Sequence, residues 1–123
     1  MIYGIGTDII EVERIKEAIL KYGDKFLKRI FTQVEIDYCE LFKDNKYLHY
    51  AARFAAKESF SKAIGTGITK GFKFNEIWIK NEESGKPIVE LSGYLLENYG
   101  KYRTSVSLSH TQGNGVAFVI MED

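Results

Sequence analysis

Two acidic side chains stand where a carboxylate is unusual: Asp8 ends an apolar, strand-like segment, and Glu58 lies inside an Ala-rich helical one. Two carboxylates that leave coordination positions open suit Mg²⁺, which keeps several waters and binds substrate phosphates. Each residue also has a plainer interpretation. Asp8 could cap a helix that begins near Glu11. Glu58 could form an i,i+4 ion pair with Lys62, worth about 0.3 kcal/mol.

Basic side chains accompany this helical segment at Arg53, Lys57, Lys62 and Lys70. They could clamp phosphates, Arg through a bidentate fork and Lys as a point charge, although a solvent-exposed basic helix face is the commoner meaning of such spacing. His110 ends a segment of hydroxyl residues before a Gly-rich turn. It could donate a hydrogen bond to a phosphate or be an exposed structural residue.

Other nucleotide and metal sites find little support in the sequence. Gly4 and Gly6 resemble the start of a dinucleotide-binding fingerprint, but Ile9 stands where the third glycine belongs. The sequence contains no phosphate-binding Walker loop, no paired-histidine zinc motif and no cysteine cluster. We therefore expect neither a Rossmann-type site nor a zinc centre.

Length and charge define the scaffold that must position these residues. The chain has 123 residues, 45% of them apolar, which predicts one domain over 1–123 with a core that needs no disulfide. The 17 basic and 17 acidic residues balance, which argues against general nucleic-acid binding. Between Arg14 and Arg29, however, basic residues outnumber acidic ones. This segment could meet an acidic partner.

Cellular context is predicted from cysteine usage and apolar runs. Cys39 is the only cysteine, which excludes an internal disulfide and suits a reducing cytoplasm. The continuous apolar run 116–121 is far shorter than the roughly 20 residues of a membrane span. The first residues lack the basic and apolar regions of a secretory signal. We therefore expect a cytoplasmic protein without a membrane segment.

Hydrophobic spacing and turn residues predict an α+β chain with one long helix. Strands are expected at 2–10, 72–80 and 88–91 and in a C-terminal hairpin with arms 105–109 and 116–121; helices are expected at 11–22, 32–42, 47–64 and 92–99. Thr32 and Glu35 match a capping box. Because 116–121 is apolar on both faces, it needs cover on both sides, which predicts an oligomer.

Two segments, Gly4–Ile15 and Arg53–Gly67, closely resemble the signature motifs of the holo-acyl-carrier-protein synthases, the small 4'-phosphopantetheinyl transferases. The shorter segments Ile30–Thr32 with Glu35, Ser84–Pro87 and Ser107–His110 match the family in the same order. The resemblance therefore extends over nearly the whole chain.

This resemblance implies a 4'-phosphopantetheinyl transferase fold, in which helices pack on a small antiparallel sheet. It also implies a homotrimer with an active site at each of three subunit interfaces, where coenzyme A and Mg²⁺ bind. The implied reaction passes the phosphopantetheine arm of coenzyme A to a serine of an apo-acyl carrier protein and releases adenosine 3',5'-bisphosphate. In the family that the chain resembles, this reaction serves fatty acid biosynthesis.

The resemblance also assigns roles to residues. Asp8 and Glu58 match the metal ligands, and Lys62 matches a catalytic residue near the diphosphate. Either Glu58 or a metal-bound water would accept the serine proton. Coenzyme A would bind at the matching positions Arg53, Lys62, Gly65, Ser109 and His110, with Arg53 and His110 near the adenosine end. The acidic carrier would dock on the basic residues Arg14, Lys21, Lys25 and Lys28.

Two other functions remain open on the sequence alone. The first is a binding module whose basic helix recognises an acidic partner, with Asp8 as a helix cap and Glu58 paired to Lys62; it needs no metal. The second is a Mg²⁺-dependent nucleotide hydrolase, which would turn over coenzyme A without any carrier.

Overall fold

The computed structural model describes residues 1–69 and 71–123, so Lys70, one of the candidate cations, lies outside the described residues. In chain order the elements are β1 (Ile2–Glu11), α1 (Val12–Tyr22), α2 (Asp24–Ile30), α3 (Gln33–Glu40), α4 (Lys46–Ala63), β2 (Ile77–Asn81), β3 (Pro87–Leu91), α5 (Gly93–Tyr99), β4 (Arg103–His110) and β5 (Asn114–Glu122). Short 3₁₀ turns at Lys43–Asn45 and Phe74–Glu76 precede α4 and β2. The predicted α+β class is confirmed.

The strands form two antiparallel sheets, one with the order β1-β5-β4 and one made of β2 and β3. The β4–β5 hairpin is present as predicted, and β5 is the central strand of its sheet. Ala117 on β5 pairs with Asp8 on one side and with Leu108 on the other. The helix-facing side of β5 is buried, whereas Phe118 on the opposite side is 40% exposed.

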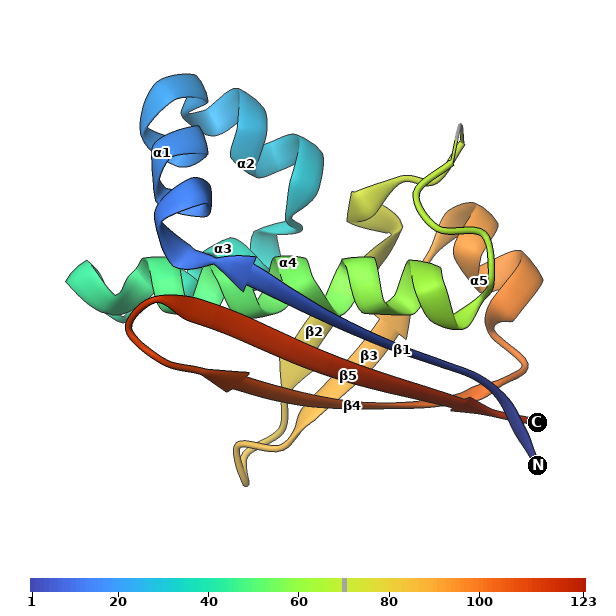
Figure 1. The fold of residues 1–123 in the computed structure, drawn as a ribbon. Coiled ribbons are helices and arrows are strands. Elements are labelled where there is room, and N and C mark those ends of the chain that lie inside the picture. The colour runs from blue at the N-terminus through green and yellow to red at the C-terminus, as the bar shows by residue number, and fades with distance from the viewer. Residues whose placement is uncertain (70) are drawn as a thin grey trace.

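The long helix α4 lies across the three-stranded sheet, with α1 to α3 over its N-terminal half and α5 beside its C-terminal end (Figure 1). Two glycines of β1 make this contact close. A Cβ at Gly6 would overlap the carbonyl oxygen of Ser59, and one at Gly4 would overlap that of Ala63. The backbones of β1 and α4 therefore touch directly, and only glycine fits at these two positions.

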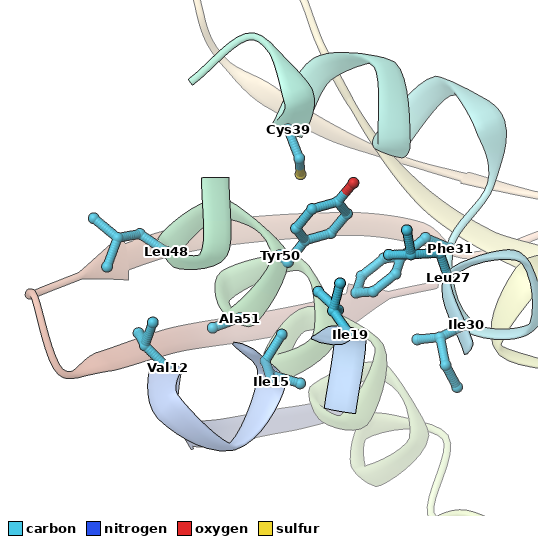
Figure 2. Packing of buried hydrophobic residues seen from close by; sticks show 10 residues of the cluster. All are labelled: Val12, Ile15, Ile19, Leu27, Ile30, Phe31, Cys39, Leu48, Tyr50 and Ala51. Carbon is cyan, nitrogen blue, oxygen red and sulfur yellow. The ribbon is translucent and has the colours of Figure 1, made fainter. Parts of the chain in front are cut away.

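The helix α1 packs on the N-terminal half of α4 through Val12, Ile15 and Ile19, which are buried as their helical spacing predicts. Figure 2 shows these side chains pointing towards α4, near Ala51. Helix α3 begins with the predicted capping box, in which the backbone N–H of Thr32 donates to Glu35 Oε1 at 3.0 Å.

Three local predictions differ from the structure. The helix α2 was not expected; Gly23, with a φ of 60°, ends α1 and leads directly into it. Helix α3 ends at Glu40 rather than at residue 42. The strand predicted from residue 72 begins only at Ile77, because β3 ends at its partner Leu91 and offers no ladder to residues 72–76.

No helix within residues 1–69 and 71–123 combines the length and the apolar character that a membrane crossing requires.

Candidate active site

Asp8, Glu58 and Lys62 come together where β1 crosses α4. Strand side chains alternate between faces, so Asp8 lies on the same face of β1 as Gly6 and is directed towards the helix. The ammonium of Lys62 donates to Asp8 Oδ1 at 3.1 Å and to the backbone carbonyl of Thr7 at 3.0 Å. Glu58 lies one helical turn before Lys62 and on the same face of α4.

The two carboxylates affect each other. The pKa of Glu58 is raised above its ordinary value, first by burial and second by the nearby negative charge of Asp8, while Lys62 acts in the opposite direction. This mutual repulsion favours a cation between the two carboxylates. A bound divalent cation would relieve it.

Both acids line a groove of about 480 Å³ between β1, α1 and α4. Its other lining residues include Arg14, Phe26 and Phe54. The groove therefore connects the two carboxylates with the exposed surface of α1, and a flexible polar substrate could reach both from there.

The residues present fit Mg²⁺. No three His, Cys, Asp or Glu side chains gather to form a metal cage in the part of the chain that the structure describes. Mg²⁺ does not need such a cage, because it is commonly held by one or two carboxylates together with water and substrate phosphates. Asp8 and Glu58 supply these two carboxylates beside an open groove.

The plainer interpretations of the two acids are wrong. The N-cap of α1 is Glu11, whose helix start has no side-chain cap hydrogen bond, so Asp8 does not cap this helix. Lys62 forms its ion pair with Asp8 on another element rather than with Glu58 on its own helix. The pairing crosses from α4 to β1, which the i,i+4 spacing did not indicate.

Lys57 is neither a phosphate clamp nor part of a solvent-exposed face. Its side chain is fully buried and its ammonium lies 2.8 Å from Glu35 Oε1. It also donates to the carbonyls of Phe74 at 2.8 Å and Ile77 at 2.6 Å. Burial lowers the pKa of Lys57, and the carboxylate of Glu35 counteracts this shift. Lys57 thus joins α3, α4 and the start of β2.

Arg53 is also buried, with only 2% of its surface exposed, so a solvent-exposed basic face is excluded here too. Its guanidinium lies 4.2 Å from the ring centroid of Tyr38 and donates to Asn81 Oδ1. The amide of Asn81 in turn donates to the carbonyl of Gly85 at 3.0 Å. The Arg53 side chain therefore links α4 to α3 and to the β2–β3 turn.

His110 and Arg53 lie near one residue that the sequence did not single out, His49. The ring of His49 stacks on Phe42 at 3.7 Å and meets His110 edge-on at 5.3 Å. The pKa of His49 falls to about 4, first through burial and then through the positive charge of Arg53 and the presence of His110. No sequence motif or spacing marked His49.

The candidate coenzyme A residues therefore fall into two clusters. One contains Lys62 and Gly65, whose N–H donates to the carbonyl of Lys62 at 3.0 Å just after α4. The other contains Arg53 and His110 around His49, with Ser109 beside His110 at the exposed end of β4. Along the axis of α4, His49 and Glu58 are about 13 Å apart. Within one chain the two clusters remain separate.

The four basic residues Arg14, Lys21, Lys25 and Lys28 are all exposed. The first two lie on α1 and the other two on α2, and Gly23 joins these helices directly. Lys25 also lines a groove together with Tyr22, Phe26 and Arg29. The α1–α2 surface therefore presents positive charge beside apolar side chains.

Comparison with known proteins gives matches over the full length of the chain. The holo-[acyl-carrier-protein] synthase of Ruminiclostridium cellulolyticum is 53% identical over 120 residues, covering 95% of this chain and 90% of the relative. That of Solibacter usitatus is 46% identical, and the match covers 100% of both chains.

Solved structures agree with this similarity. The holo-[acyl-carrier-protein] synthase structure from Neisseria meningitidis superimposes with a TM-score of 0.87 at 40% identity and 100% coverage of both chains. The enzyme from Bacillus anthracis, solved in complex with CoA (3',5'-ADP), gives a TM-score of 0.84 at 40% identity, covering 100% of this chain and 98% of that one. The resemblance and the fold expected from it are confirmed. Because the family model of the 4'-phosphopantetheinyl transferase superfamily also matches residues 4–119, the chain belongs to this superfamily.

Proposed function

We propose that residues 1–123 act as one catalytic domain that transfers the 4'-phosphopantetheine group from coenzyme A to a serine of an apo-acyl carrier protein. Adenosine 3',5'-bisphosphate is the second product. The observation that carries this proposal is the convergence of Asp8, Glu58 and Lys62 beside a groove that opens towards basic α1. The relatives named holo-[acyl-carrier-protein] synthase support it.

In this proposal Asp8 and Glu58 hold Mg²⁺. When bound, Mg²⁺ supplies a Lewis acid that neutralises charge on the diphosphate of coenzyme A. The ammonium of Lys62 adds a second positive charge there, on the leaving-group side. Asp8 and Glu58 are the carboxylates among the described residues that line the groove, and Asp8 is engaged by Lys62. The serine proton would pass either to Glu58 or to a water molecule in the groove.

A homotrimer would bring the two clusters of coenzyme A residues together across a subunit boundary. The open face of the three-stranded sheet carries apolar side chains, with Ile5 56%, Ile9 63% and Phe118 40% exposed. Contiguous exposed apolar surface of this kind is typical of subunit interfaces. In such a trimer, Ser109 and His110, the exposed members of the second cluster, would face the adenosine end of coenzyme A held at Lys62 of the neighbouring copy, and the buried Arg53 would lie behind them.

The acidic carrier would dock on the α1–α2 surface, where Arg14, Lys21, Lys25 and Lys28 are exposed. Exposed charges of this kind steer a partner towards the site and fix its orientation. Because the groove leads from this surface to the carboxylates, a serine presented there can reach the diphosphate. A cytoplasmic location suits both the substrate and the lone, buried Cys39.

Mass spectrometry of an apo-acyl carrier protein incubated with the enzyme, coenzyme A and Mg²⁺ tests this function. We expect the carrier to gain the mass of one phosphopantetheine group on a serine, and only when all three components are present. A carrier of unchanged mass would contradict the transferase. If coenzyme A is consumed without the carrier, the protein is a hydrolase; if nothing is consumed, it is a binding module.

A further inference from the structure

Lys62 and the proposed metal ion would both bind the carboxylate of Asp8. The ammonium of Lys62 lies 3.1 Å from Asp8 Oδ1, within ion-pair distance of one of the two carboxylates that would bind Mg²⁺. Its positive charge also opposes the rise in the pKa of Glu58, the other carboxylate. A divalent cation held between the two acids would meet this positive charge at short range, and the two cations repel each other.

The Lys62 side chain is free to leave Asp8. Its side chain is 50% exposed, whereas the Asp8 side chain is 17% exposed. Its second hydrogen bond goes to the backbone carbonyl of Thr7, an exposed contact at 3.0 Å. Lys57 differs in this respect, because it is fully buried and held by one carboxylate and two carbonyls. Of these two lysines of α4, Lys62 is the one that can change partners.

We propose that Lys62 competes with the metal ion for Asp8 and releases Asp8 when the diphosphate of coenzyme A offers the ammonium a second anionic partner. Lys62 would thereby couple metal binding to coenzyme A binding. This inference rests on the proposed function, since it requires both the metal site and the diphosphate. The inference adds a role for Lys62 before substrate binding: its ammonium weakens metal binding until it can pair with the diphosphate.

The coupling arises because the Lys62 ammonium can pair with either Asp8 or the diphosphate of coenzyme A. Without coenzyme A, a metal ion must either displace the ammonium from Asp8 or bind beside the ammonium. Each of these weakens the binding of the metal. With coenzyme A, the ammonium pairs with the diphosphate and the metal meets an unshared carboxylate. Thermodynamic linkage then requires that the metal strengthen coenzyme A binding by the same factor. A neutral side chain at position 62 removes both effects.

The test is Mn²⁺ binding to the full chain, measured by electron paramagnetic resonance of the free ion, with and without coenzyme A. Lys62→Met removes the charge at similar length, and Lys62→Arg retains it. Lys80→Met is the matched control, because it removes one exposed positive charge that pairs with Glu90 away from the site. Circular dichroism confirms that each variant is folded.

Without coenzyme A, we expect Lys62→Met to bind Mn²⁺ about three- to tenfold more tightly than the unchanged protein. Lys62→Arg and Lys80→Met should stay within about twofold of it. With coenzyme A present, the advantage of Lys62→Met should disappear. The ratio of the Mn²⁺ dissociation constants without and with coenzyme A should therefore fall in this variant alone.

Three results would overturn the inference. The first is unchanged or weaker Mn²⁺ binding to Lys62→Met without coenzyme A, and the second is an equal gain in Mn²⁺ affinity in Lys62→Arg. The third is that, without coenzyme A, neither the unchanged protein nor Lys62→Met binds Mn²⁺. Failure of the metal site itself is distinguishable. It would appear as no Mn²⁺ binding to the unchanged protein with coenzyme A, or as binding that Asp8→Ala leaves intact.

Discussion

Lys57 and Glu58 are consecutive residues of α4, yet one side chain ends in the core and the other lines the groove. Successive side chains leave a helix about 100° apart. The ion pair of Lys57 with Glu35, at 2.8 Å, therefore favours the rotation of α4 about its axis that directs Glu58 towards the groove. The direction of a proposed catalytic charge thus depends in part on a buried structural charge.

The first prediction concerns this buried pair. Lys57→Met leaves the carboxylate of Glu35 buried without its cation and should lower the free energy of unfolding by about 3–5 kcal/mol. The double variant Glu35→Leu with Lys57→Met should lose less than the sum of the two single losses, because no unpaired charge remains. Urea denaturation at one fixed protein concentration measures the free energy of unfolding of the two single variants and of the double variant. Additive losses would show that the two side chains do not interact.

The second prediction concerns the two carboxylates of the groove. Asp8→Ala and Glu58→Ala should each abolish transfer and leave a folded protein, because each removes a proposed ligand of the cation that neutralises the diphosphate. Glu90→Ala, which removes an acid on β3, should retain transfer. The mass gain of the carrier serine reports activity. Near-normal transfer by both groove variants would rule out the metal assignment.

The third prediction concerns the basic α1–α2 surface. Reversing Arg14 and Lys21 to Glu should raise the Michaelis constant for the carrier protein and weaken its dependence on ionic strength, because exposed charges act at long range and are screened by salt. Binding of coenzyme A, measured by calorimetry, should stay nearly unchanged. Reversal of the exposed Lys101 serves as the control. If coenzyme A binding is lost as fully as carrier binding, this surface belongs to the nucleotide site or to the trimer.

The fourth prediction concerns assembly. Light scattering should give the mass of a trimer, and Phe118→Asp, which places a charge on the open face of the sheet, should give a monomer without activity. The matched control is Leu41→Asp, because Leu41 is 73% exposed and lies just after α3, away from this face. A stable monomer with full activity would contradict a site that is shared between subunits.

The fifth prediction concerns pH. In the unfolded chain His49 takes up a proton near its ordinary pKa of 6.5, whereas in the folded protein it stays neutral until about 4. Between these values the unfolded state binds more protons, so the free energy of unfolding falls as the pH falls. In urea denaturation series between pH 6.5 and about 4, the free energy of unfolding of His49→Phe should fall less steeply with falling pH than that of the unchanged protein. An unchanged slope would show that His49 does not titrate in this way.

Local patterns were sufficient to predict most of the fold. The capping box at Thr32 and Glu35, the Ala-rich course of α4 and the alternation in the C-terminal hairpin are each determined by near neighbours in the chain. Helix α2 was missed because one glycine separates two helices, and a single glycine after α1 was interpreted as the end of helical structure.

Contacts between distant residues could not be predicted in the same way. The sequence marked Lys57 as a basic residue and Glu35 as a cap, but nothing in their spacing showed that they meet in the core. The i,i+4 spacing offered Lys62 a partner on its own helix as one interpretation, whereas its ion-pair partner lies on β1. The type of each residue was visible in the sequence, and its partner depended on how α4 crosses the sheet.

The two glycines of β1 have a consequence for how this protein tolerates mutation. Because Gly4 and Gly6 bring main chain against main chain, the spacing between Asp8 and α4 does not depend on how side chains fill the core. Truncation of the buried residues Ile19 or Leu27, which do not line the groove, should therefore lower the melting temperature while the rate constant of the folded fraction stays nearly the same. Thermal robustness and catalytic rate can thus change independently as such proteins diverge.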